Sequence, residues 1–240
     1  MTSDIIVAGA NGHFGKRIFT GLKTSGYSVV GVDKHVERNP QSGIVQCDFA
    51  SVSQTREYFE KISPLDGSEQ LVLILALGKI HSEPMLNWGE GGFAVHSEGA
   101  WDEVFESNLK SVFVSTTEFA RMCRIKRSSG LVIAFSSVSA NGNPGQAAYS
   151  SAKAGVEGFI RSVAKELGPI GIRAVSIAPG FFSTDSTRTS IEENRLAKVV
   201  RSTPLRRLGE VEELVSTISW LIENRFVTGT TIQIDGGLTL

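Results

Sequence analysis

Cysteine is scarce in this chain of 240 residues, which contains only Cys47 and Cys123. Both thiols stand inside apolar stretches, and no pattern of metal ligands surrounds either of them. A domain held together by several disulfides is therefore excluded. We expect two buried thiols in a reducing compartment and no metal-binding residues.

An excess of charge is missing as well, since 24 basic side chains face 25 acidic ones and the net charge is -1. Such a balance gives no field that would concentrate nucleic acid or an anionic membrane, so we expect neither partner. The longest apolar run, residues 71–77, is far shorter than the roughly 20 residues that cross a bilayer. The N-terminal MTSDIIVAGANG lacks the basic and apolar regions of a secretion signal, so we expect a cytoplasmic protein.

The sequence does contain a series of short apolar runs with helical stretches between them. The seven runs span residues 5–8, 29–32, 44–47, 71–77, 131–135, 174–177 and 231–234. Most are continuously apolar, so both faces of each strand should be covered, as in a parallel sheet flanked by helices. No linker or repeat divides the chain. We predict a single doubly wound α/β domain over residues 1–240, with a seven-stranded, mainly parallel sheet and helices on both faces.

Helical periodicity is strongest over residues 151–167, where apolar side chains recur at helical spacing until Gly168 and Pro169 end the pattern. Residues 79–99 show no clear periodicity, and we expect them to form a long loop over the carboxyl ends of the strands. Further helices are predicted over residues 12–22, 101–123 and 211–222.

A glycine-rich turn follows the first apolar run and opens a predicted helix. Glycines allow a close approach, so backbone N–H groups and the helix N-terminus can face a pyrophosphate. The alternative is a tight strand-to-helix turn without a ligand. The candidate cofactor-binding residues in this turn are Gly9, Asn11, Gly12, His13, Phe14 and Gly15.

The second run ends in Asp33, whose carboxylate can accept hydrogen bonds from the hydroxyls of an adenosine ribose and would repel a 2′-phosphate. This favours NAD over NADP. The nearby Lys34, His35 and Arg38 can offer a phosphate a positive site, which leaves NADP open. After the third run, Asp48 can bind the adenine amino group or cap the following helix, and both roles can coexist.

Tyr149 and Lys153 follow the fifth run and are four residues apart, so they lie on one face of the predicted helix. A phenol with a pKa of about 10 is a weak base at neutral pH, and a neighbouring ammonium favours its ionised form by Coulombic attraction. Taken singly, such a pair is also typical of a helix surface with a solvated lysine. Its position after a serine-containing strand end and a nucleotide-type turn favours a catalytic pair.

Further segments extend this pattern. Asn108 stands in SNLK, residues 178–184 read APGFFST, and TPLRRLGE and DGG come near the C-terminus. With the glycine turn and the pair at 149 and 153, they resemble the short-chain dehydrogenase/reductase family over nearly the whole chain. The resemblance implies a Rossmann-type fold and an NAD(P)-dependent oxidoreductase that moves a hydride between nicotinamide and a secondary alcohol or ketone. It also implies a homotetramer or homodimer built on the helices at 101–123 and 151–167.

The resemblance implies roles for single residues too. The Ser137 hydroxyl would hydrogen-bond the substrate oxygen, and Tyr149 would act as general acid or base. Tyr149 and Lys153 would also bind the cofactor, Lys153 through the nicotinamide ribose. Asn108 would support a proton relay through ordered water. The remaining cofactor-binding positions that it implies are Phe49, Leu77, Gly78, Pro179, Gly180, Phe182 and Thr184.

The chain departs from the family's pattern at the nucleotide end. The spacing of Gly9, Gly12 and Gly15 fits the TGxxGxxG variant, not the commoner TGxxxGxG. Residues 75–78 read LALG where the family has NNAG. Apolar packing must therefore replace the asparagine side chains that brace the sheet.

The catalytic serine is open between two neighbours. The family's usual spacing of 13 residues before the tyrosine selects Ser136, whereas counting along the strand from Gly130 selects Ser137. We prefer Ser137, because a loop tolerates a deletion more easily than a strand tolerates a slip in register.

The stretch at 79–99 leaves the substrate open. It holds His81, Glu83, Trp88 and His96, which can suit a hydroxylated, sugar-like or carboxylated substrate in place of an acyl chain, or can form a solvated surface. Epimerase or dehydratase chemistry would also begin with hydride transfer. The lost NNAG side chains and the altered glycine turn favour a third hypothesis, a non-catalytic nicotinamide-binding sensor or scaffold. The intact candidate catalytic residues argue against it.

Overall fold

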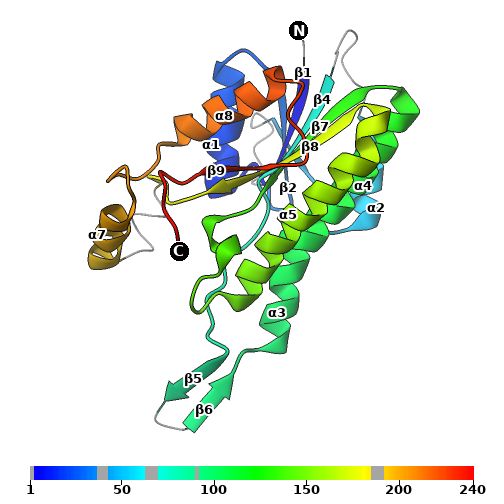
Figure 1. The fold of residues 1–240 in the computed structure, drawn as a ribbon. Coiled ribbons are helices and arrows are strands. Elements are labelled where there is room, and N and C mark those ends of the chain that lie inside the picture. Colours follow the sequence, from blue (N-terminus) through cyan, green and yellow to red (C-terminus); the bar gives the residue numbers. More distant parts are fainter. Residues whose placement is uncertain (1–2, 37–42, 63–69, 90–91, 185–191) are drawn as a thin grey trace.

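A seven-stranded sheet forms the centre of the molecule (Figure 1). The structure is a computed structural model and describes residues 3–36, 43–62, 70–89, 92–184 and 192–240. The strands are β1 (Ser3–Ala8), β2 (Ser28–Asp33), β3 (Ile44–Gln46), β4 (Gln70–Leu75), β7 (Ser129–Phe135), β8 (Ile172–Pro179) and β9 (Thr231–Ile234). Their order is β3-β2-β1-β4-β7-β8-β9, and neighbouring strands pair in parallel. The predicted doubly wound sheet is confirmed.

Helices cover both faces of this sheet (Figure 1). One face carries α1 (His13–Thr24) and α8 (Val211–Glu223), and the other carries α2 (Val52–Lys61), α4 (Ser111–Lys126) and α5 (Ala147–Leu167). Alternate side chains of a strand point to opposite faces, so Ile5 and Val7 pack with α1 and α8 while Ile6 and Ala8 pack with the other helices. All of β4 is buried, which explains its nearly continuous apolar sequence.

The stretch at 79–99 contains a β-hairpin where we expected an irregular loop. Its strands β5 (Leu86–Gly89) and β6 (Gly92–Val95) pair antiparallel, with Trp88 opposite Phe93 and their ring centroids 5.7 Å apart. The hairpin projects away from the sheet beyond α3 (Glu98–Phe105), and its side chains are exposed (Figure 1). The loop prediction was wrong, because two short strands without a buried face leave no apolar period in the sequence.

The helix predicted at 101–123 is confirmed and runs from α3 through a π-helical turn into α4 without leaving the helical conformation. A π-helical turn, η2 (Glu106–Lys110), joins α3 to α4 and carries Asn108. Such turns are rare and are frequent at functional sites. The helix predicted from 151 begins earlier, at Ala147, which places Tyr149 in its first turn. Apolar periodicity identified both helices, but it missed the π-helical turn at Glu106–Lys110 and the start of α5 at Ala147.

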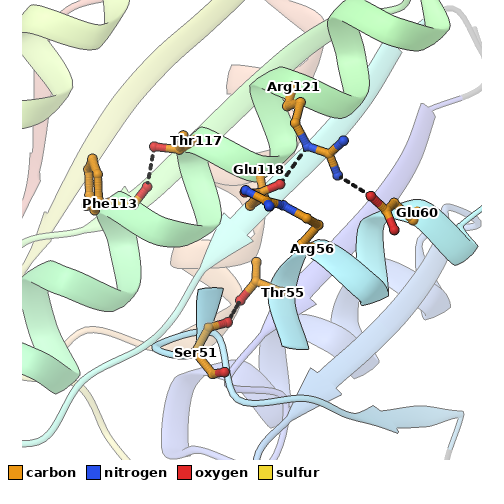
Figure 2. A network of polar contacts seen from close by, with 8 residues as sticks. All are labelled: Ser51, Thr55, Arg56, Glu60, Phe113, Thr117, Glu118 and Arg121. Carbon is orange, nitrogen blue, oxygen red and sulfur yellow. Dashed lines mark hydrogen bonds and ion pairs between the residues drawn. The ribbon is translucent and has the colours of Figure 1, made fainter. Parts of the chain in front are cut away.

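The α-helices α2 and α7 (Glu193–Ser202) were not predicted. A polar network fixes α2 on α4, as Figure 2 shows. The Glu118 carboxylate accepts hydrogen bonds from Arg56 Nη2 at 2.8 Å and from Arg121 Nε at 2.7 Å, and Arg121 also contacts Glu60. The hydrogen bond from Arg56 is the largest cause that lowers the pKa of Glu118. This network holds the chain just before α2 beside the cavity described below.

Both cysteines are buried and unpaired, as predicted. Burial raises the pKa of Cys47 to about 11 and that of Cys123 to about 12. Neither thiol is therefore an ionised nucleophile at neutral pH. Within the described ranges, no helix is both long and apolar enough to cross a membrane.

Candidate active site

The glycine-rich turn after β1 is a tight backbone cradle. Gly9 has a φ of +78°, and a Cβ there would lie 2.5 Å from the Ala76 carbonyl oxygen. A Cβ on Gly15 would lie 1.9 Å from the Gly9 oxygen, and Gly12 N donates to that same oxygen at 2.8 Å. Only glycine fits these positions, and the turn delivers the N-terminus of α1 to the carboxyl end of β1.

A cavity of about 880 Å³ opens at the carboxyl ends of β1, β2, β3 and β4. A crevice at this edge of a parallel sheet is where doubly wound folds bind nucleotides. The backbone cradle and this volume fit a nicotinamide dinucleotide. The predicted cofactor residues in its lining are Gly9, Asn11, Gly12, Asp33, Asp48, Phe49, Leu77 and Gly78.

The Asp33 carboxylate lies at the end of β2, in the cavity wall, together with Lys34 and His35. One of its oxygens accepts a hydrogen bond from Asn11 N at 2.9 Å and the other accepts one from His35 N at 3.0 Å. These bonds fix the carboxylate in the cavity wall. Arg38, the third candidate cation, lies outside the described residues.

Asp48 also lines the cavity, but it does not cap α2. Its Oδ1 accepts a hydrogen bond from Ala50 N at 2.9 Å, and the N-cap is Ser51, which accepts from Gln54 N. The capping role expected for Asp48 is wrong, because the chain makes one more turn before the helix begins. Asp48 keeps its predicted place in the cavity wall.

The turn residues His13 and Phe14 lie outside the cavity lining as the structure describes it. His13 is exposed at the start of α1. The Phe14 ring packs 6.0 Å from the Phe135 ring and 5.6 Å from the Phe182 ring, centroid to centroid. These three rings join the glycine turn to the ends of β7 and β8.

The two candidate serines point to different partners. Ser136 is buried, and its hydroxyl donates to Glu157 Oε1 at 2.8 Å and to the Lys153 carbonyl at 3.2 Å. The Ser137 hydroxyl instead accepts a hydrogen bond from Ser139 N at 3.1 Å, and its interaction with the Tyr149 hydroxyl acts to lower the pKa of Tyr149. The strand register therefore brings Ser137, and not Ser136, to the tyrosine.

Burial sets the protonation of the pair at 149 and 153. It raises the pKa of Tyr149, and the hydrogen bond from Ser137 acts in the opposite direction. Burial lowers the pKa of Lys153 to about 7, and its Nζ donates to the carbonyls of Phe135 at 2.8 Å and Leu77 at 3.3 Å. The Coulombic effect expected from helical spacing does not set the pKa of Tyr149, because desolvation dominates in this interior.

Asn108 reaches the same place from the π-helical turn. Its Nδ2 donates to the carbonyls of Val104 at 2.9 Å and Lys79 at 3.0 Å. Its Oδ1 is buried and has no hydrogen-bond partner within the described part of the chain. A Cβ on Gly78, whose φ is +129°, would lie 2.1 Å from that oxygen and 3.2 Å from Lys153 Nζ. Three predicted residues thus converge at one end of the cavity.

The segment after β8 packs against β9 and lies outside the cavity lining as the structure describes it. Gly180 N donates to the Ile234 carbonyl at 2.9 Å, and a Cβ on Gly180 would lie 2.8 Å from Asp235 Cα. Thr184 is 5% exposed, and its N–H donates to the Phe182 carbonyl. Pro179, at the end of β8, leads into this segment, which is held in place by β9.

Sequence reasoning missed two groups near this site. The Phe135 carbonyl holds Lys153, and a backbone acceptor leaves no signal in the sequence. Gln146, just before α5, accepts hydrogen bonds from Ser139 and Asn143 and donates to Ser82. It ties the catalytic helix to the stretch that leads to the hairpin.

The family follows from comparison with known proteins. The family model described as Enoyl-(Acyl carrier protein) reductase matches residues 17–239. The chain belongs to the short-chain dehydrogenase/reductase family. It is accordingly an NAD(P)-dependent oxidoreductase that acts on alcohol and ketone groups.

Individual relatives agree with this assignment. The chain is 30% identical over 253 residues to a 3-oxoacyl-[acyl-carrier-protein] reductase of Staphylococcus aureus, covering 99% of this chain and 98% of the relative. It is 40% identical over 144 residues to an enzyme of the same name from Synechocystis sp., covering 58% of this chain and 56% of the relative. The structure of 4-hydroxyisoleucine dehydrogenase complexed with NADH matches with a TM-score of 0.84 and 25% identity, over 98% of each chain.

Proposed function

We propose that this enzyme reduces the 3-oxo group of an acyl substrate, reversibly and with NADH, and that Tyr149 moves the proton. The observation that carries the proposal is the buried Tyr149 side chain, whose hydroxyl interacts with Ser137. Lys153 and Asn108 meet nearby at Gly78, which lines the cavity. Similarity to 3-oxoacyl-[acyl-carrier-protein] reductases supports the acyl class of substrate.

When bound, the nicotinamide supplies or accepts the hydride at the substrate carbon. In reduction, Tyr149 donates its phenolic proton to the substrate oxygen, and the raised pKa keeps that proton available. Ser137 donates a hydrogen bond to the same oxygen and stabilises the charge that develops on it. In oxidation, Tyr149 accepts the proton from the alcohol.

Lys153 replaces the proton that Tyr149 gives up. With a pKa of about 7, Lys153 loses and regains a proton near neutral pH. The buried Oδ1 of Asn108 lies beside it and orders the path toward solvent. The glycine cradle would hold the pyrophosphate, Asp33 the ribose and Asp48 the adenine, and residues 179–184 would hold the carboxamide.

The substrate class is tested by NADH consumption. We expect turnover with 3-oxoacyl thioesters, whereas turnover with keto sugars alone would overturn the acyl assignment. Tight NADH binding in calorimetry without turnover of any ketone would instead support the sensor hypothesis. The alternative of a sugar-like substrate rested on the polar side chains at 79–99. In the structure, His81 and His96 both contact Glu83, so these three side chains are partners of one another.

The assignment of the serine gives a prediction. Ser137→Ala should lower kcat/KM for ketone reduction by about 100-fold, the usual cost of removing one donor to a developing oxyanion. Ser136→Ala should instead lower the stability by about 1 kcal/mol, because it loses the hydrogen bond to Glu157. Steady-state kinetics and thermal melts of both variants measure this, and the reverse ranking in kcat/KM would select Ser136.

We propose NAD as the cofactor, because the Asp33 carboxylate stands where a 2′-phosphate would approach. Asp33→Ser should raise the ratio of kcat/KM for NADPH over NADH by about 100-fold, since it removes a like-charge contact. Asp48→Asn is the matched control, because it removes a charge from the same cavity without touching the ribose end. An unchanged ratio in Asp33→Ser would show that another group selects the cofactor.

We propose that copies of the chain associate through α4 and α5 as a homotetramer or homodimer. Phe113 is 51% exposed on α4, its ring meets the Phe159 ring of α5 at 6.2 Å, and both line an apolar groove with Leu109. Phe113→Glu should shift the sedimentation of the protein to that of a monomer. Phe226→Glu, at a phenylalanine that is 99% exposed, should not. A monomeric wild type with full activity would refute the association.

We also propose that residues 1–240 work as one domain in the cytoplasm. The two buried, unpaired thiols support a reducing compartment.

A further inference from the structure

Three side chains with metal-ligating atoms meet at the base of the β5–β6 hairpin. His81 and Glu83 precede β5, and His96 directly follows β6. His81 Nε2 lies 3.0 Å from Glu83 Oε2, and His96 Nδ1 lies 3.4 Å from that oxygen. The three ligand atoms all lie within 4.8 Å of one another. The hairpin thus brings His96, at its end, close to His81 and Glu83, which precede it.

The distances between these atoms are close to the distances between neighbouring ligand atoms around tetrahedral zinc. Tetrahedral zinc with bonds of about 2.0–2.1 Å separates neighbouring ligand atoms by about 3.3 Å. Two of the three separations, 3.0 and 3.4 Å, are already close to that value. The third separation, between the two histidine nitrogens, is at most 4.8 Å, and rotation of the His81 ring, about one third exposed, can adjust it.

The chemistry of the ligands selects the kind of ion. Two imidazole nitrogens and one carboxylate oxygen form a set that zinc uses in sites with an open fourth position. Calcium and magnesium prefer shells made of oxygen alone. We propose that His81, Glu83 and His96 bind one zinc-class divalent ion, with the fourth position left for water.

The surroundings hold the ligands in place. The His96 side chain is 5% exposed and packs edge-on against Trp101, with ring centroids 6.3 Å apart. His96 N donates to the Met85 carbonyl, and Glu83 N donates to the Gly145 carbonyl at 2.7 Å. His81 and Glu83 are about one third exposed, which leaves the ion a path from solvent.

Zinc binding would replace one existing contact of His96 and would join the two ends of the hairpin. His96 Nδ1 lies 2.9 Å from the Ser97 carbonyl, and the ion must displace this contact. In return, the ion joins the two ends of the hairpin and secures them beside Gly145, just before the catalytic helix. The expectation of no metal-binding residues rested on cysteine spacing, which says nothing about histidines brought together by a hairpin.

The test is calorimetric titration of the chelator-treated, full-length protein with zinc chloride. We expect one zinc per chain and a higher Tm with zinc. Replacing zinc with cobalt(II) should give the visible absorption bands of a tetrahedral nitrogen and oxygen site. These readouts do not depend on enzymatic activity, so they stand or fall separately from the proposed function.

Variants assign the site. Glu83→Gln and His96→Asn should each weaken zinc binding by at least about 100-fold, more than the loss of a supporting group would cost. His13→Asn and His35→Asn are the matched controls and should bind zinc as the wild type does. Circular dichroism checks that each variant is folded, and the conservative Glu83→Gln keeps the test valid if His96→Asn unfolds. The absence of zinc binding by the wild type, or wild-type affinity in Glu83→Gln, would overturn the proposal.

Discussion

Tyr149→Phe is expected to lower kcat by about 10²–10⁴-fold, the usual contribution of a positioned general acid or base. The variant keeps the ring and loses only the hydroxyl that carries the proton and bonds Ser137. Because the variant loses one hydroxyl at most from the cofactor site, the Kd for NADH should stay within about tenfold of the wild-type value, the cost of about one hydrogen bond. Steady-state kinetics and a fluorescence titration with NADH measure the two quantities.

Tyr58→Phe is the matched control for this experiment. Tyr58 is also a buried tyrosine, its hydroxyl has no hydrogen-bond partner within the described residues, and it lies in α2. Its loss should leave kcat unchanged. Wild-type turnover in Tyr149→Phe would show that the proton reaches the substrate oxygen from another group.

Gly78→Ala is expected to lower both activity and stability. A Cβ at this position would lie 2.1 Å from Asn108 Oδ1, so either the amide or the backbone must move. Displacing a positioned group by about 1 Å costs about 100-fold in rate, and we expect kcat to fall by that factor. The unfavourable φ of +129° adds strain of about 1–3 kcal/mol. Steady-state kinetics and thermal melts measure both effects.

Gly142→Ala is the control variant, because it introduces backbone strain without a steric clash. Gly142 has a φ of +103°, but a Cβ there would have no neighbour within 4 Å. We expect this variant to lose stability and to keep its kcat. If Gly78→Ala also keeps its kcat, the placement of Asn108 does not matter for the reaction, and the proposed proton path is wrong.

Local patterns predicted the scaffold well. The buried strands were visible because both of their faces are covered, and the turn at Gly9 was visible because only glycine fits it. The pair at 149 and 153 was visible because helical spacing is local. Helix α2 was missed because few of its residues are buried, and so was α7, of which none is buried.

The sequence by itself determined the fold class, the position of the nucleotide turn and most of the residues at the candidate site. Only the tertiary structure decided that Ser137 and not Ser136 meets Tyr149, because the end of β7 sends neighbouring side chains to opposite sides. It also decided that Lys153 is desolvated against two carbonyls, and that a hairpin joins His81 to His96. These contacts depend on chain segments that meet only in the folded molecule, and spacing along the sequence cannot encode them.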